Sequence, residues 1–336
     1  MARPKNRDEY RRELAEGFAH VLEEKGLAWK KEWTGSGGGA PHNGITRACY
    51  KGSNAFWLSL VSMMKGYSDP RWVTMVQIMD TDGKYHPKEK WHLKAGSKAT
   101  WVEYWMPWDV KAKKAITWDQ YREELKKGRL ENEFSLTARY SAVFNAADVE
   151  GMPELPAPEG NKDIREDELV KKLSEEMRVE ILLDGGDNAY YAPHEDRIHL
   201  PAPESFTSEY AFNATALHEL SHSTGHPSRL NRVQSGFFGS SEYAYEELVA
   251  EMCSCFMGIC LEVGTDTGHI DNHKAYVQSW IQAIRNKPEM LMRAIKDAQD
   301  AANYMDWKAG LMTDKEYEDS IRFVKEIKSK EKEQER

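Results

Sequence analysis

Apolar residues at helical spacing predict several helices in this 336-residue chain. Residues 6–25 are a clear case, because Phe18 and Leu22 are four positions apart and lie on one side of a helix. The same pattern predicts further helices at residues 54–64, 206–225 and 241–264. For the helix that starts near 206, Ser208 is the expected N-cap and Gly225 the expected end.

Shorter apolar runs, rich in β-branched and aromatic residues, predict strands. These runs are residues 71–79, 99–105 and 140–145, together with a hairpin at 188–201. Residues 151–161 are rich in proline and glycine, which is typical of a semi-rigid linker. We therefore predict an α+β protein with two domains, 1–150 and 162–310, followed by a charged helix or tail at 311–336.

Composition separates the same two halves of the chain. Residues 1–150 carry 25 Lys and Arg against 20 Asp and Glu, whereas the remaining residues carry 21 against 35. Nine of the eleven tryptophans also fall in the first half. We find no apolar run of about eighteen residues and no apolar leader, so we expect neither a membrane span nor a secretory signal. The four cysteines have neither disulfide-framework nor zinc-ribbon spacing, which favours reduced thiols and a cytoplasmic protein.

A candidate metal motif, HELSH, lies in the predicted helix at 206–225. Residues four apart lie one above the other on a helix, so His218 and His222 present two imidazoles to the same point, as Zn²⁺ requires. Glu219 is rotated off that line and is a candidate base that takes a proton from water. The alternative is two surface histidines on an ordinary amphipathic helix. A metzincin would have its third histidine at the position of Ser228, which leaves His226 as a minor candidate ligand.

The predicted helix at 241–264 offers a better third ligand. Glu247 and Glu251 are one turn apart beside an apolar face, and acidic residues in such a place favour a cation. Two histidines from one helix and a glutamate from a second are the gluzincin arrangement, in which Glu247 is the third ligand and Glu251 orients a ligand histidine. Gluzincins usually have aspartate as the residue that orients the histidine, so Glu251 departs from the usual pattern. The alternative is that Glu246 and Glu247 belong to a solvated face.

The first half interleaves aromatic and basic residues, which is typical of proteins that bind single-stranded DNA, because bases stack on rings while phosphates attract cations. No recognition helix or zinc finger for duplex DNA is apparent. About half of the tryptophans are expected to be core residues instead. The candidate DNA contacts are Trp29, Lys30, Lys31, Trp33, Tyr50, Lys51, Asn54, Arg71, Trp72, Lys90, Trp91 and Lys94.

Together, these motifs resemble the ArdC-type antirestriction proteins of conjugative plasmids and related elements. The stretches that carry the resemblance are GLAWKKEW, YKGSNAFWL, RWVTMVQ, VFN, HELSHSTGHPSRLNR and YAYEELVAEM. The resemblance implies an N-terminal domain that binds single-stranded DNA and a C-terminal zincin-like metallopeptidase domain with Zn²⁺ and a protein or peptide substrate. It also implies a role in protecting incoming DNA from host restriction. Residues 111–133 look like an insertion relative to the family pattern.

Three functions stay open from the sequence. The first is a DNA-associated metalloprotease, and the second is a DNA-coating protein whose zincin fold is structural and does not cut. The third is a primase-related accessory protein, which is disfavoured because no acidic polymerase constellation stands beside a glycine-rich motif. Intact ligands permit activity without proving it, so the sequence does not separate the first two.

Overall fold

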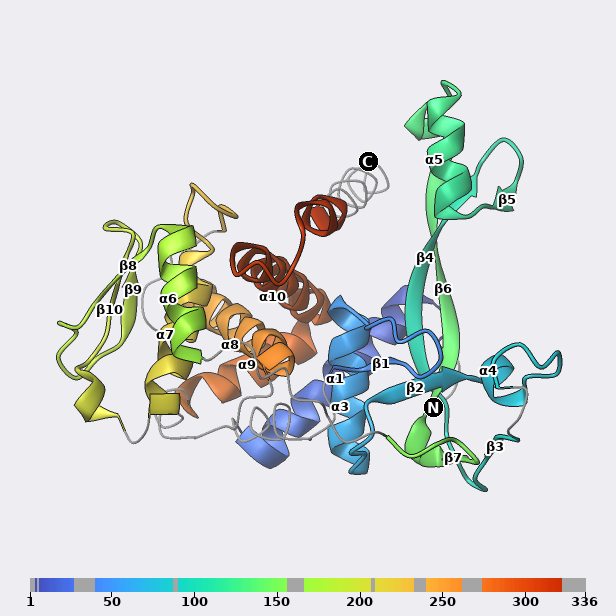
Figure 1. Cartoon of the computed structure of the whole chain (residues 1–336), viewed down its shortest axis with the longest axis horizontal. Helices are drawn as coiled ribbons and strands as arrows, with labels where there is room; N and C mark the ends of the chain where they lie inside the picture. The colour runs from blue at the N-terminus through green and yellow to red at the C-terminus, as the bar shows by residue number, and fades with distance from the viewer. Residues whose placement is uncertain are drawn as a thin grey trace.

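The computed structural model describes residues 4, 6–26, 40–86, 90–155, 166–206, 209–232, 240–261 and 274–321. Its first half is built on a five-stranded sheet of order β1-β2-β6-β4-β5, in which two long antiparallel strands, β4 and β6, run side by side (Figure 1). A separate small ladder joins β3 to β7. The strands are β1 (His42–Asn43), β2 (Arg71–Thr74), β3 (His92–Leu93), β4 (Thr100–Asp109), β5 (Lys114–Ala115), β6 (Phe134–Asn145) and β7 (Val149–Glu150).

Most helices in this half begin where the sequence supplies a side-chain cap. Asn6 accepts a hydrogen bond from the Glu9 backbone N–H and starts the first helix close to its predicted bound. The predicted helix at 54–64 is confirmed with a slightly earlier start. The helices are α1 (Arg7–Lys25), α3 (Gly52–Lys65), α4 (Met75–Met79) and α5 (Trp118–Lys126), with single turns η2 (Glu131–Glu133) and η3 (Ala146–Asp148).

The predicted strand at 71–79 is correct only as far as Thr74. The Thr74 hydroxyl accepts from the Gln77 backbone N–H, and the Gln77 side chain accepts from the Thr74 backbone N–H. This capping box turns the chain into α4. A short apolar run is compatible with either element, and here the local cap decides.

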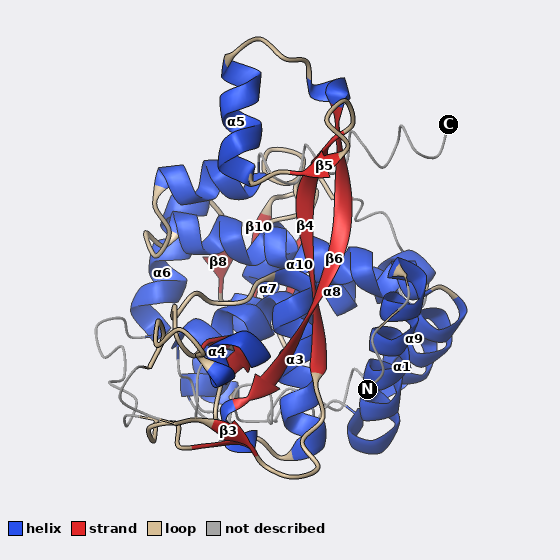
Figure 2. Cartoon of the chain, turned by 90° about the vertical axis from the view of Figure 1, so that its right-hand side faces the viewer, coloured by secondary structure: helices blue, strands red, loops and turns tan. Residues whose placement is uncertain are grey.

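The expected insertion at 111–133 forms an arm that projects from the body of the protein (Figures 1 and 2). It comprises β5, α5 and η2 at the distal end of the β4–β6 ribbon. A small apolar cluster of Ile116, Tyr121 and Phe134 holds the arm together, and Arg129 forms an ion pair with Asp109. The arm therefore has its own packing, separate from the main core.

The second half is mostly helical and carries a three-stranded sheet of order β8-β10-β9. The predicted hairpin at 188–201 is confirmed by the antiparallel pair β9 and β10, and β8 pairs with β10 in parallel. The expected N-cap Ser208 lies outside the described residues. The elements are α6 (Glu166–Met177), β8 (Glu180–Leu182), β9 (Tyr190–Ala192), β10 (Arg197–His199), η4 (Pro203–Ser205), α7 (Glu209–Ser223), α8 (Ser241–Leu261), α9 (Lys274–Asn286) and α10 (Pro288–Lys308).

One hydrophobic core runs through both halves. Helix α1, from the first half of the sequence, packs against α9 and α10 of the second half, and α10 also packs against α3. Phe18 and Trp280 belong to the same buried cluster. At the surface of this contact, Arg285 forms ion pairs with Glu16 at 2.7 Å and Glu23 at 2.5 Å. Among the described residues, no helix is long and apolar enough to cross a membrane.

Candidate metal centre and interdomain cleft

The two histidines of HELSH meet a glutamate from the next helix. His218 and His222 lie on α7, with their Nε2 atoms 3.2 Å apart. Glu247 of α8 has one carboxylate oxygen 3.7 Å from Nε2 of His218 and the other 3.6 Å from Nε2 of His222. One ligand atom from each of the three residues lies within 4.8 Å of the other two. The three residues predicted to bind metal are thus brought together by the packing of α7 on α8.

A second carboxylate lies behind each histidine. Oε2 of Glu251 is 3.9 Å from Nδ1 of His218, which is the contact predicted for this glutamate. Oε1 of Glu246 is 3.4 Å from Nδ1 of His222, a contact that the sequence did not predict. Glu246 and Glu247 are only 7% and 5% exposed, so the alternative of a solvated acidic face is wrong. The only sign of this contact in the sequence is that Glu246 directly precedes Glu247.

The acids around His222 favour the cationic form of its imidazole. Burial alone lowers the pKa of the His222 imidazole, but the hydrogen bond with Glu246 and the charges of Glu247 and Glu219 outweigh it and raise the pKa to about 9. Burial has the opposite effect on a carboxyl and raises the pKa of Glu246. The hydrogen bond with His222 and the charge of Arg232 outweigh it and bring the pKa below its ordinary value. The site is therefore electrostatically prepared for a cation.

The donor set fits a divalent metal ion. Two imidazole nitrogens and one carboxylate oxygen are a usual set of three protein ligands for zinc, and imidazole with carboxylate also suits other divalent ions. Glu219 is buried, and its charge raises the pKa of His222, as expected for a carboxylate that lies beside the ligands. His226 instead lies with Nδ1 2.7 Å from the Ser228 hydroxyl, outside the only such ligand group found among the described residues.

Two of the twelve candidate DNA contacts are buried, and two others are hydrogen-bonded within the N-terminal half. Trp72 is 1% exposed within the main core, and the Trp91 ring stacks on His86 at a centroid distance of 3.9 Å. Neither indole offers a face to a base in this structure, which corrects our expectation. Asn54 donates to the Glu103 carbonyl at 2.6 Å, and Arg71 pairs with Asp69 at 2.7 Å. The sequence pattern missed the burial of the two tryptophans because core and binding aromatics have the same composition.

The remaining candidates are at or near the surface, or are not described. Lys51, Lys90 and Lys94 are exposed, and Tyr50 is half-buried. The Lys94 ammonium donates to the Ala147 carbonyl at 2.7 Å. Four candidates lie outside the described residues, namely Trp29, Lys30, Lys31 and Trp33.

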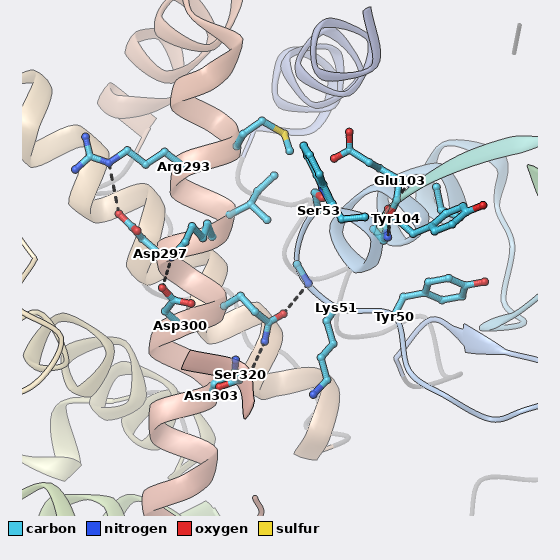
Figure 3. Close-up of a pocket in the computed structure, with 18 of the residues that line it drawn as sticks. Tyr50, Lys51, Ser53, Glu103, Tyr104, Arg293, Asp297, Asp300, Asn303 and Ser320 are labelled. Atoms are coloured by element: carbon cyan, nitrogen blue, oxygen red, sulfur yellow. Dashed lines mark hydrogen bonds and ion pairs between the residues drawn. The ribbon is translucent and has the colours of Figure 1, made fainter. Parts of the chain in front are cut away.

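A large cleft of about 2590 Å³ lies between the two halves. Tyr50 and Lys51, which precede α3, line this cleft, and the Tyr50 ring is directed away from α10 (Figure 3). Gln299 of α10 accepts a hydrogen bond from the Gly52 backbone N–H at 2.9 Å. Tyr104 of β4, 45% exposed, lines the same wall and was not among the predicted residues. The alternation of β4 in a sheet was the signal that could have identified it. The opposite wall on α10 is rich in acids that are already paired with bases, such as Asp297 with Arg293.

Comparisons with known proteins match both halves of the chain. Residues 8–144 match the N-terminal domain of the anti-restriction factor ArdC, and residues 168–297 match the zincin-like metallopeptidase family. An uncharacterized protein of Sinorhizobium fredii, y4eC, is 31% identical over 79% of this chain and 80% of its own length. Two Escherichia coli proteins named DNA primase TraC are 32% and 34% identical over 88% and 87% of this chain. The chain spans only 27% and 19% of the lengths of those two proteins.

Solved structures match nearly the whole chain. The crystal structure of the antirestriction ArdC protein from plasmid R388 in its metal-free form has a TM-score of 0.68 at 26% identity, covering 90% of this chain and 98% of that one. Its Mn(II)-bound form has a TM-score of 0.67. The two matched domains occur in the same order as the two halves of this fold. The chain therefore belongs to the family of ArdC-type antirestriction proteins, with an ArdC N-terminal domain followed by a zincin-like metallopeptidase domain.

Proposed function

We propose that this antirestriction protein binds single-stranded DNA through its N-terminal half and hydrolyses peptide bonds at a zinc centre in its C-terminal half. The observation that carries the proposal is the buried group of His218, His222 and Glu247. Glu219 stands beside it on α7, and a carboxylate backs each histidine. A purely structural site normally closes its coordination with four protein ligands, whereas three leave room for water or substrate.

The residues of the site divide the chemistry between them. Zinc held by His218, His222 and Glu247 would supply Lewis acidity, which polarises a peptide carbonyl and lowers the pKa of a coordinated water. Glu219 takes a proton from the water molecule while the water oxygen bonds to the carbonyl carbon. It then passes that proton to the amide nitrogen as the carbon–nitrogen bond breaks.

Support for DNA binding comes from the basic and aromatic wall of the cleft. Tyr50 and Tyr104 offer rings on which bases can stack, and Lys51 beside them offers a charge to a phosphate. Lys90 and Lys94 add exposed charge elsewhere on the same half. This binding should weaken as salt rises, because lysine–phosphate contacts release counterions.

The test of catalysis is Glu219→Gln, which keeps the shape of the side chain and removes the base. Metal content should stay at the wild-type level, while hydrolysis of a denatured protein substrate should fall by about a hundredfold or more. Glu209→Gln is the matched control, because Glu209 is an exposed glutamate in the first turn of the same helix. Elemental analysis of the purified protein distinguishes zinc from manganese.

The second candidate function is a DNA-coating protein with a catalytically silent zincin domain. It is favoured by the shared core, which makes the zincin helices a support for α1 and α3. If fully metallated wild type and Glu219→Gln are equally inactive with single-stranded DNA present, this second function replaces the first. If Glu219→Gln also still protects DNA in cells, the zincin fold serves as a scaffold.

A further inference from the structure

Arg232 connects the two helices that carry the metal ligands. Its Nε and Nη2 atoms donate to the Glu246 carboxylate of α8 at 3.1 and 2.5 Å. Its Nη1 donates to the Thr224 hydroxyl at 2.6 Å, and Nη2 donates to the Ser221 carbonyl of α7 at 3.1 Å. The side chain is only 8% exposed, so its charge depends on these partners. One guanidinium therefore ties the end of α7 to the first turns of α8.

Glu246 extends this connection to a metal ligand. Its Oε1 atom receives Nη2 of Arg232 and also lies 3.4 Å from Nδ1 of His222. Nε2 of the same imidazole is the atom that faces His218 and Glu247. We propose that Glu246 and Arg232 are positioning residues that orient His222 for the divalent metal ion. The proposal rests on the proposed metal centre. It gives a role to two residues that belong neither to HELSH nor to the third ligand, Glu247.

Glu246 and Arg232 fix the tautomer of His222 and the balance of charge around it. A carboxylate at Nδ1 holds the ring hydrogen there, which leaves the lone pair of Nε2 directed at the cation. Arg232 fixes the direction of that carboxylate with two parallel hydrogen bonds, a geometry that lysine does not reproduce. Without the Glu246 charge, the buried guanidinium would be left uncompensated near the cation.

A comparable pair nearby supplies a control. Arg229 has a side chain only 4% exposed and pairs with Asp196, and its Nε donates to the Ser223 carbonyl at the end of α7 at 2.7 Å. This pair thus also fastens the end of α7, but no contact joins it to His218, His222 or Glu247 among the described residues. A role limited to stability would make the two pairs equivalent.

The experiment compares matched variants of the full chain after removal of metal. Glu246→Gln is paired with Asp196→Asn, and Arg232→Lys with Arg229→Lys. Affinity for Zn²⁺ is measured by competition with a chelator, and the visible spectrum of the Co²⁺-substituted protein reports ligand geometry. Thermal unfolding of the metal-free proteins measures the structural cost of each change. None of these measurements requires peptidase activity, so failure of this proposal is distinguishable from failure of the proposed catalysis.

We expect Glu246→Gln to weaken Zn²⁺ binding by about ten- to a hundredfold and to change the Co²⁺ spectrum. Arg232→Lys should have a smaller effect in the same direction, which keeps the proposal testable if Glu246→Gln does not fold. Asp196→Asn and Arg229→Lys should lower the melting temperature without changing either metal readout. Wild-type Zn²⁺ affinity and spectrum in both Glu246→Gln and Arg232→Lys would overturn the proposal.

Discussion

The candidate metal centre and the cleft wall that we propose for DNA binding are built on opposite physical principles. Around His222 the charged groups are buried and hold one another in place, because Glu246 contacts both His222 and Arg232. On the wall of the cleft, Tyr104 and Lys51 are exposed, while the similar-looking Trp72 is in the core. Helical spacing identifies the first kind of site, because it fixes which side chains share a face. Aromatic and basic composition predicts a region for the second kind of site but not the residues that form it.

The largest expected effect separates a core tryptophan from a surface ring. Trp72→Ala should lower the free energy of unfolding by about 3–5 kcal/mol, because it leaves a cavity in the main core. Tyr104→Ala should change it by less than about 0.5 kcal/mol, because that ring is nearly half exposed. Denaturant unfolding measures both. Comparable losses in the two variants would contradict the assignment of Trp72 to the core and of Tyr104 to the surface of the cleft.

A ligand variant tests the metal centre. His222→Ala should weaken Zn²⁺ binding by more than about a hundredfold, a larger loss than is typical when an outer partner is removed. His226→Ala should bind Zn²⁺ as wild type does, because His226 pairs with Ser228 away from the group. Chelator competition on both variants and on Glu247→Ala measures this. Full Zn²⁺ retention in Glu247→Ala, with loss in His226→Ala, would show that the third ligand is misassigned.

The stability of the protein should depend on pH through Asp306, a largely buried carboxyl that, among the described residues, lacks the close cationic partners that Glu246 has. Burial, only partly offset by the charge of Lys51, raises the pKa of Asp306 to about 6. Since the unfolded carboxyl ionises near its ordinary pKa of about 4, stability should decrease as pH rises from about 4 to 6. Asp306→Asn should therefore be more stable than wild type by about 3 kcal/mol at pH 7 and about equal to it at pH 4. Equal stability of the two proteins at pH 7 would contradict the raised pKa.

The smallest expected effect is on DNA binding. Lys51→Ala should weaken binding of a single-stranded oligonucleotide several-fold at low salt and reduce the slope of log affinity against log salt by about 0.7. Lys171→Ala is the control, because Lys171 is an exposed lysine of α6 outside the cleft. Fluorescence anisotropy with the full chain measures both. Equal losses in the two variants would place the DNA elsewhere on the protein.

Much of the secondary structure follows from local sequence, and the exceptions have physical causes. The strands at 99–105 and 140–145 are confirmed, but each is longer than predicted, because the pairing between them extends to the base of the arm. The predicted strand at 71–79 ends early, since the capping box between Thr74 and Gln77 starts a helix. The linker separates the sequence into two halves, yet α1 buries its apolar face against α9 and α10.

The sequence alone determined the elements that depend on neighbours along the chain. His218 and His222 share a face because they are one helical turn apart, and the same spacing relates Glu247 to Glu251. Only the tertiary structure decided contacts between distant segments: Arg232 on Glu246, Glu246 behind His222, and the burial of Trp72. The reason is that helix geometry fixes the directions of nearby side chains, whereas the partner of a charge or a ring at long separation depends on how the whole core packs.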